Sequence, residues 1–107
     1  RAASRNMITG RIGGEEFAIL MPDAEPSLAR LFGERIRAEI AVCAAGRLPA
    51  GLDPTVSVGL HVGPPSSTLY ELLANADVAL YEAKRTGRNR VCAYRSDFEP
   101  ATERARR

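Results

Sequence analysis

The sequence predicts a single α+β domain whose elements follow the order strand, strand, helix, strand, helix, strand. Three patterns support this prediction. Two short apolar runs flank a pair of glycines, two segments repeat apolar residues every three or four positions, and one segment alternates apolar residues with small or polar ones. The length of 107 residues is enough for one domain with its own core, and too short for two.

The first two strands are expected at residues 7–12 and 17–21, as the two arms of a hairpin. Residues 13–16, with the sequence GGEE, separate them, and a glycine-containing connection of this length is typical of a β-hairpin. The adjacent carboxylates therefore lie at the tip of the hairpin or just past it. Because like charges repel, the pair is either a solvated turn or part of a site that holds a cation.

A helix is expected to begin near Pro26, because proline lacks an N–H group that the first helical turn would leave unpaired. Its apolar stripe follows the helical period. The stripe consists of Leu28, Leu31, Phe32, Ile36 and Ile40. After a loop at residues 46–54, residues 55–62 alternate as in a strand, with Ser57, Gly59 and His61 on one face. The small residues on that face are expected to let a helix or another strand approach closely.

The second helix has the clearest sequence signals. Thr68 and Glu71 form a capping box ahead of an apolar stripe that extends to Ala83, and Gly87 supplies a stop. A last strand is expected at residues 90–94. This order predicts a domain over residues 1–95, followed by a linker over residues 96–107.

Two segments carry residues with complementary chemistry, the GGEE tip and the sequence AKRTGRNR at the end of the second helix. Glycines let a ligand approach the backbone, and carboxylate oxygens are natural ligands of Mg²⁺. Lys84 and Arg88 are four residues apart around a helix end and can bind phosphate oxygens from the same side. On spacing alone the ordinary interpretation is favoured, because helix ends often carry basic residues and glutamates at turns are usually solvated.

The sequences RIGGEEF (residues 11–17) and NADVALYEAKRTGRNRV (residues 75–91) together resemble the GGDEF family of diguanylate cyclases. The first is the family's signature loop in its GGEEF form. The second matches the family pattern A-D-x-A-L-Y-x-A-K-x-x-G-R-N. The segment VSVGL lies between them, where the family has a strand. The resemblance runs from about residue 5 to residue 94, and it implies a palm-like, mainly antiparallel sheet with helices packed on it.

The resemblance also implies a reaction and a set of site residues. Family members condense two GTP molecules into cyclic di-GMP as dimers. By position in the motifs, Glu15 would bind the catalytic Mg²⁺ (or Mn²⁺) and help to deprotonate the 3′-hydroxyl group, and Glu16 would be a second acidic group close to the metal. Gly13 and Gly14 would leave room for the nucleotide. The triphosphate would be held by Lys84 and Arg88.

Parts of the family pattern have no counterpart in this sequence. Missing are the family's first strand, with an Asp that is the other main Mg²⁺ ligand, and a helical region that reads guanine. If these residues are the whole protein, the sheet lacks a central strand, and the chain should be unstable, dimerise through the gap or be completed by another segment. We therefore expect cyclase activity from the intact parent protein and little or none from this chain alone.

Composition narrows the other possibilities. The formal net charge of +2 comes with no basic stripe interleaved with aromatic residues, so nucleic-acid binding is not expected. Direct membrane contact is not expected either, although a larger parent could be membrane-anchored. The isolated Cys43 and Cys92 favour a reducing cytoplasm. The tail at residues 96–107 resembles a junction that leads into an EAL phosphodiesterase domain. This leaves a second interpretation, a non-catalytic GGDEF module that binds GTP and regulates a phosphodiesterase.

Overall fold

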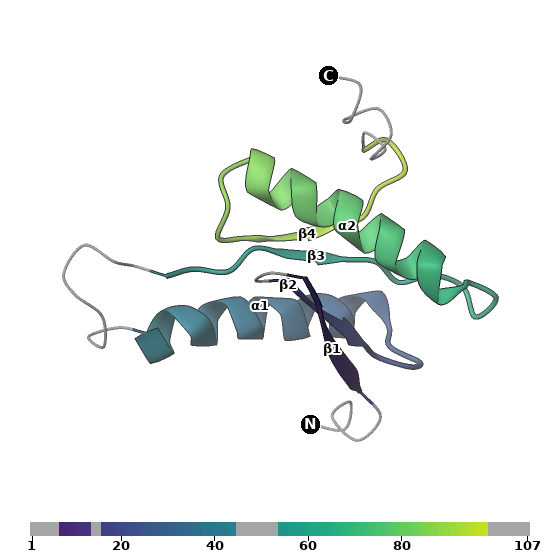
Figure 1. The fold of residues 1–107 in the computed structure, drawn as a ribbon, viewed down its shortest axis with the longest axis horizontal. Helices are drawn as coiled ribbons and strands as arrows, with labels where there is room; N and C mark the ends of the chain where they lie inside the picture. Colours follow the sequence, from purple (N-terminus) through teal and green to yellow (C-terminus); the bar gives the residue numbers. More distant parts are fainter. Residues whose placement is uncertain (1–6, 14–15, 45–53, 99–107) are drawn as a thin grey trace.

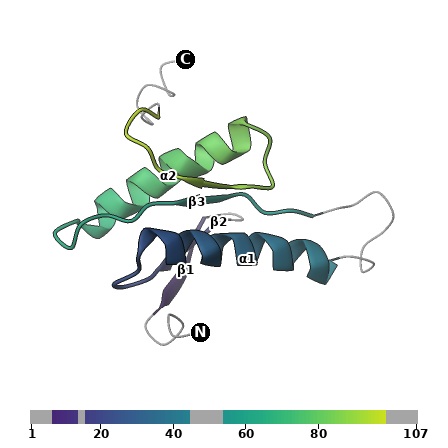
Figure 2. The same cartoon turned by 180° about the vertical axis from the view of Figure 1, so that it is seen from behind.

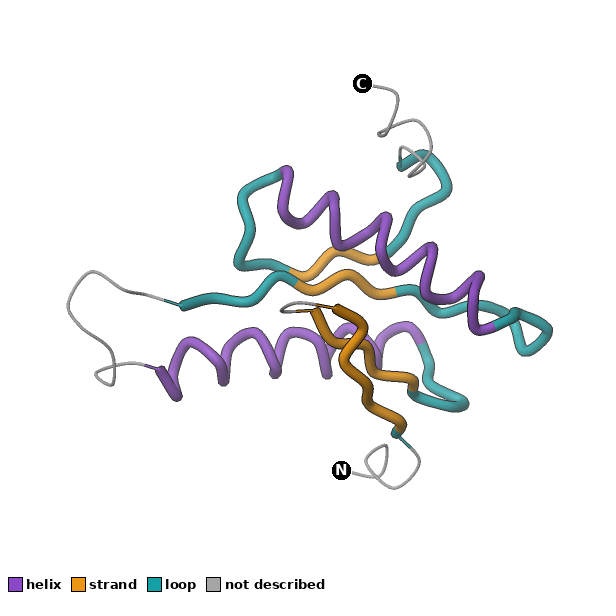
Figure 3. The backbone as a smooth tube through the Cα atoms, in the orientation of Figure 1, coloured by secondary structure: helices purple, strands orange, loops and turns teal. Residues whose placement is uncertain are grey.

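The computed structural model describes residues 7–13, 16–44 and 54–98. These residues form four strands and two helices in the order that the sequence predicts (Figure 1). The α+β class is therefore confirmed. The described strands do not form one continuous sheet, however, because they pair only two by two, β1 with β2 and β3 with β4 (Figure 3).

The hairpin consists of β1 (Ile8–Gly13) and β2 (Glu16–Leu20), which pair in antiparallel fashion. Ile8 lies opposite Leu20 at the open end, and Gly13 lies opposite Glu16 at the closed end. The register shifts between Arg11 and Gly13, as expected when one strand carries an extra residue. Glu16 is thus the first residue of a strand, one position earlier than the sequence predicts.

The second strand pair consists of β3 (Val58–Leu60) and β4 (Val91–Ala93). It is parallel, in contrast to the mainly antiparallel sheet that the family resemblance implies. The reason lies in the connection, because α2 (Leu69–Arg85) joins the end of β3 to the start of β4. A crossover helix of this kind returns the chain to the same edge of the sheet, and the second strand then runs in the same direction as the first.

The β3–β4 pair lies between the two helices, with α2 on one face and α1 (Pro26–Ala44) on the other (Figure 1). A Cβ atom added at Gly59 would fall on the backbone of α2, 2.6 Å from the Cα atom of Leu80. A Cβ atom added at Gly33 of α1 would meet the methyl groups of Val58 and Val91 at 3.4 Å. The expectation that small residues on the strand let a helix approach is therefore confirmed at Gly59.

The hairpin lies on the near side of α1 in Figure 1 and behind it in the reverse view of Figure 2. Its apolar residues are poorly covered, and Phe17 and Ile8 expose 71% and 63% of their surface. By contrast, all the buried apolar side chains among the described residues belong to α2 and β4. They are Val78, Ala79, Ala83 and Val91. The core therefore sits where α2 meets the parallel strands.

The capping box that the sequence predicts at the start of α2 is confirmed. The Thr68 hydroxyl accepts a hydrogen bond from the backbone N–H of Glu71 at 3.1 Å, and the Glu71 carboxylate accepts one from the backbone N–H of Thr68 at 2.9 Å. These bonds satisfy two donors that the first turn of a helix leaves unpaired. α1 likewise begins at Pro26, as predicted. In the described part of the chain, neither helix has the length and apolar character needed to cross a bilayer.

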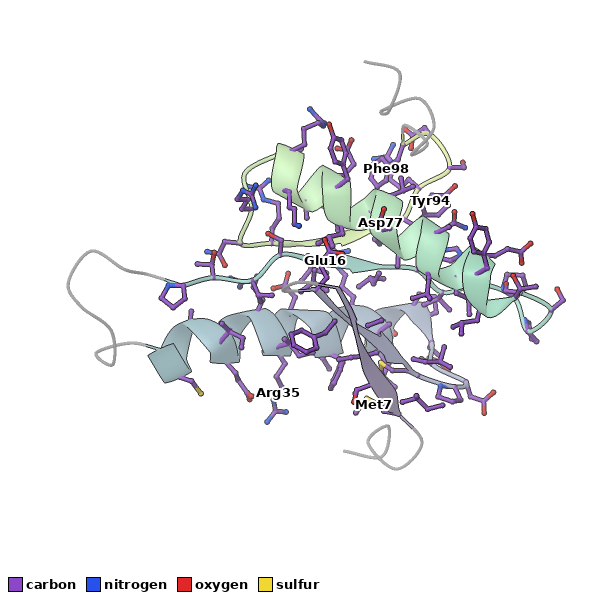
Figure 4. The ribbon with its side chains drawn as sticks, in the orientation of Figure 1. Met7, Glu16, Arg35, Asp77, Tyr94 and Phe98 are labelled. Atoms are coloured by element: carbon purple, nitrogen blue, oxygen red, sulfur yellow. The ribbon has the colours of Figure 1, made fainter. Side chains whose placement is uncertain are left out.

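Two aromatic residues that follow β4, Tyr94 and Phe98, pack together with His61. The ring of Tyr94 packs edge-on against His61 at 5.0 Å between ring centroids and against Phe98 at 6.5 Å. Asn75 of α2 lies 3.3 Å from Nε2 of His61. Figure 4 shows Tyr94 and Phe98 together beside α2, so residues 94–98 pack on the domain.

Candidate functional site

The hairpin supplies the acidic half of the candidate site. Gly13 ends β1 and pairs with Glu16, which begins β2. Figure 4 shows Glu16 at the end of the hairpin closest to β3. The other two predicted residues of the loop, Gly14 and Glu15, lie outside the described residues. The described acidic half is therefore the Glu16 carboxylate, whose side chain is 40% exposed.

The last turn of α2 supplies the basic half. Lys84 lies one residue after Ala83, which is completely buried, so the position of its backbone is fixed by the core. Its Nζ atom donates a hydrogen bond to Oε2 of Glu16 at 3.5 Å, and its side chain is 31% exposed. This contact joins two motifs that are 68 residues apart in the chain. The structure thus brings together Glu16 and Lys84, two of the residues that the sequence proposes for the site.

The ion pair between Lys84 and Glu16 is long and partly open to solvent. Such pairs contribute about 0–1 kcal/mol to stability, because solvent screens the charges and the side chains lose freedom when they pair. A ligand that offers a cation to Glu16 and an anion to Lys84 can therefore replace it at little cost.

Arg88, the remaining predicted site residue, lies in the turn that follows α2. Gly87, Arg88 and Asn89 all have positive φ angles, of 138°, 62° and 48°. The backbone N–H of Arg88 donates to the carbonyl oxygen of Ala83 at 2.8 Å, which closes the end of the helix. Within the described residues, the Arg88 guanidinium makes no hydrogen bond or ion pair, and the residue is exposed. It is available to bind an anion four residues beyond Lys84.

Sequence reasoning missed Arg37 and Ser57, which hold this turn through Asn89. Arg37 of α1 donates from Nη1 to Oδ1 of Asn89 at 3.0 Å, across 52 residues of sequence. The backbone N–H of Asn89 also donates to the hydroxyl of Ser57, just before β3, at 3.2 Å. The sequence places Asn89 inside the second motif but gives it no partner. No local spacing pairs it with α1, so only the fold reveals the contact.

The donor chemistry of the site can be compared with what a metal needs. Among the described residues there is no cluster of three or more His, Cys, Asp or Glu side chains that could enclose a metal. Mg²⁺ does not need such a cluster, because it is usually bound by one or two carboxylates together with phosphate oxygens of the substrate. Glu16 beside Lys84 fits that pattern, with one group for the cation and one for the phosphates. The described residues fit a metal–triphosphate complex better than a metal alone.

Comparison with protein families identifies one match, the family described as "Diguanylate cyclase, GGDEF domain", over residues 1–90. The matched region includes both halves of the candidate site, from Gly13 to Arg88. It stops one residue before β4.

Two curated relatives place the match in context. The chain is 37% identical over 91 residues to the diguanylate cyclase DgcM of Escherichia coli, covering 85% of this chain and 22% of that protein. It is 33% identical over 89 residues to the bifunctional diguanylate cyclase/cyclic di-GMP phosphodiesterase MucR of Pseudomonas aeruginosa, covering 82% of this chain and 13% of that protein. The chain therefore spans less than a quarter of each of these relatives.

Two solved structures have the same fold. One is the coiled coil and GGDEF domain of DgcB from Caulobacter crescentus in complex with c-di-GMP, with a TM-score of 0.72 and 31% identity over 85% of this chain and 49% of that one. The other is the active GGEEF domain of a diguanylate cyclase from Vibrio cholerae. Its TM-score is 0.71 and its identity 30%, over 88% of this chain and 60% of that one.

Proposed function

We propose a function from one premise: this chain belongs to the GGDEF family of diguanylate cyclase domains. The proposal is that the protein containing it condenses two molecules of GTP into cyclic di-GMP and releases two pyrophosphates. In each step the 3′-oxygen of one GTP loses its proton and forms a bond to the α-phosphorus of the other, while the bond from that phosphorus to pyrophosphate breaks.

In this proposal the acidic half of the site binds the metal and the basic half binds the triphosphate. Glu16, with Glu15 from the adjoining loop, holds Mg²⁺ (or Mn²⁺), and Lys84 and Arg88 hold the phosphates. A bound divalent cation would lower the pKa of the attacking hydroxyl and offset the charge that develops on the phosphate oxygens. Gly13 and Gly14 present no side chain to the nucleotide. With substrate bound, Glu16 would hold the metal and Lys84 a phosphate instead of each other.

The single observation that supports this assignment is the 3.5 Å contact between Nζ of Lys84 and Oε2 of Glu16. A phosphoryl-transfer site requires groups of opposite charge at one point, because the metal and the triphosphate bind each other. The two motifs contribute one such group each, from separate supersecondary units. If the motifs were unrelated surface features, nothing would require their charged side chains to meet.

Dimerisation belongs to the same proposal. One site of this kind holds one GTP, and bond formation requires the 3′-hydroxyl of a second GTP at the first one's α-phosphorus. Two domains that face each other provide this proximity, which a single domain with one nucleotide cannot provide. We therefore propose a homodimer as the active form, with activity that rises with protein concentration.

The test compares two adjacent positions on α2. The protein that contains this chain is incubated with GTP and Mg²⁺, cyclic di-GMP is measured by chromatography, and GTP affinity is measured separately. Lys84→Met should weaken GTP binding by about tenfold or more, since it removes a charge-assisted hydrogen bond. It should leave GMP binding nearly unchanged, because GMP lacks the phosphates that Lys84 holds. Glu16→Gln and Glu15→Ala should abolish most product formation.

Arg85→Met is the matched control, since it removes the same charge one residue further along the helix. Arg85 is engaged by Glu82 of its own helix, with 2.7 Å between Nη2 and Oε1. GTP affinity should change by less than about threefold, as expected for the loss of an exposed charge. Equal losses in Lys84→Met and Arg85→Met would show that general electrostatic attraction, not the site, determines binding.

The second candidate function is a regulatory module that binds GTP without making product. It is favoured by the similarity to MucR, a bifunctional cyclase and phosphodiesterase. A parent protein of that kind would carry an EAL or sensor domain next to this one and act in the cytoplasm. GTP binding that depends on Lys84, together with no cyclic di-GMP from the wild type, would support this alternative over the cyclase.

A further inference from the structure

The turn after α2 has an unusual backbone that the rest of the domain must hold in place. Three consecutive residues, Gly87, Arg88 and Asn89, lie at positive φ angles. Glycine tolerates such angles and asparagine adopts them more often than most residues, whereas for arginine they are uncommon. A non-glycine residue in this region persists where its surroundings hold it there, and such residues concentrate at functional sites.

Hydrogen bonds from three elements hold this turn. From α2, the carbonyl oxygen of Ala83 accepts the N–H of Arg88 at 2.8 Å. At the start of β3, the hydroxyl of the preceding residue Ser57 accepts the N–H of Asn89 at 3.2 Å, and the N–H of Val58 donates to the carbonyl oxygen of Arg90 at 2.9 Å. The backbone of the turn is thus tied on both sides.

The third element is α1, and its contact is made between side chains. Nη1 of Arg37 donates to Oδ1 of Asn89 at 3.0 Å, while Nε of Arg37 donates to Oε1 of Glu34 at 2.9 Å. Because a guanidinium has only donors, the amide oxygen of Asn89 is the partner that faces it. Glu34 neutralises Arg37 and fixes its direction, and the Arg37 side chain is only 28% exposed. The result is a relay from Glu34 through Arg37 to Asn89.

We propose that Arg37 and Asn89 are positioning residues for triphosphate binding. The relay fixes the backbone at Asn89, and through it the angle at which the neighbouring Arg88 side chain leaves the turn. Arg88 is then already oriented, beside Lys84, toward the position that the phosphates will occupy. This lowers the entropy cost of binding. Neither Arg37 nor Asn89 touches the nucleotide in this proposal. The inference rests on the proposed function, because it assumes that Arg88 binds a phosphate.

Two arginines of α1 offer a matched comparison. Arg35 and Arg37 each pair with a glutamate of the same helix, Arg35 with Glu39 at 3.0 Å, but Arg37 alone of the two bonds to the turn. In the protein that contains this chain, Arg37→Gln should speed hydrogen exchange at the amides of residues 88 and 89 and weaken GTP binding about three- to tenfold. GMP binding should hardly change. Arg35→Gln should match the wild type in both measurements.

Substitutions at Asn89 separate positioning from general stability. Asn89→Gly permits the positive φ angle but removes the amide, and it should reproduce the effect of Arg37→Gln. Asn89→Asp keeps an oxygen for Arg37 to bond and should retain GTP affinity within about twofold. In an Arg88→Met background, Arg37→Gln should have no further effect on GTP binding, because it acts through Arg88. Circular dichroism confirms that each variant is folded.

The proposal is overturned if Arg37→Gln leaves the exchange of residues 88 and 89 unchanged. It is also overturned if Arg37→Gln weakens GTP and GMP binding equally, or if its effect persists undiminished in the Arg88→Met background. If the wild-type protein bound no GTP, the proposed function itself would be contradicted. Hydrogen exchange would still decide whether the relay orders the turn, so the two failures can be distinguished.

Discussion

The two halves of the candidate site are supported very differently by the fold. The basic half stands on β3, α2 and β4, where Ala79 and Ala83 are fully buried and a backbone-to-backbone contact occurs at Gly59. The acidic half stands on the β1–β2 hairpin, where Phe17 is 71% exposed and, within the described residues, each strand pairs only with the other. An isolated two-stranded hairpin is at best marginally stable in water.

This difference suggests that the basic half is the preformed part and the acidic half the adjustable part. In the proposed function, a rigid basic half would present Lys84 to the phosphates in a fixed position, while the hairpin could adjust around the substrate. The Lys84–Glu16 ion pair joins the two halves. A partly exposed pair of this kind contributes little to stability, so it can open at little cost. If the two halves differ in rigidity, similar substitutions in them should differ in cost.

The largest effect is expected from adding one methyl group to the helix–strand contact. In Gly59→Ala the new Cβ atom would meet backbone atoms of Leu80 and Ala76, which cannot move without shifting α2. We expect a loss of about 3 kcal/mol or more in the free energy of unfolding, at the upper end of overpacking costs. Urea denaturation followed by circular dichroism measures it, and failure to fold counts as the same result.

Gly10→Ala is the control in the hairpin. A Cβ atom at Gly10 would meet nothing within 4 Å, so this substitution should change stability by no more than about 0.5 kcal/mol. Comparable losses at both glycines would contradict the contrast between a tightly packed unit and a loosely supported hairpin.

A smaller effect is expected at the start of α2. Thr68→Ala removes the hydroxyl that accepts the N–H of Glu71, and the loss should be about 1 kcal/mol. Glu71→Gln keeps a side-chain oxygen for the N–H of Thr68 and should cost less. Thermal unfolding of both variants would check this order. If Thr68→Ala had no effect, the capping box would not help to anchor the helix that carries Lys84.

The smallest effect concerns pH. Burial lowers the pKa of His61 from its ordinary value of 6.5. Above that value the ring is neutral in both the folded and unfolded states, so it adds no pH dependence. As the pH falls below 6.5 the unfolded state takes up a proton more readily, and stability decreases until the folded pKa is passed.

His61→Gln should remove this component of the pH dependence, because His61 is the one histidine of the chain. The measurement is the urea midpoint of the wild type and the variant at several pH values between about 5 and 8. The two curves should run parallel above pH 7 and diverge below it. Parallel curves throughout would mean that the His61 environment does not resist protonation.

Local patterns in the sequence were enough to predict the order of the elements, and they named the residues that we propose for the site. Local rules explain this success, because alternation, helical periodicity, the Thr68–Glu71 capping box and Pro26 each act over a few neighbouring residues. The motif around Gly13 and the motif around Arg88 also gave the family, which is shown by the match over residues 1–90. Chemistry that depends on residue type was therefore readable in advance.

The contacts between residues far apart in the sequence depend on the tertiary structure. The parallel pairing of β3 with β4 follows from the path of a whole crossover helix, and the 3.5 Å contact of Lys84 with Glu16 brings together residues 68 apart. The bond from Arg37 to Asn89 likewise spans 52 residues and leaves no periodic mark in either segment. Local preferences act along the chain, whereas these contacts depend on how separate elements pack. For that reason the sequence could name the groups of the site but not the partner that holds each one.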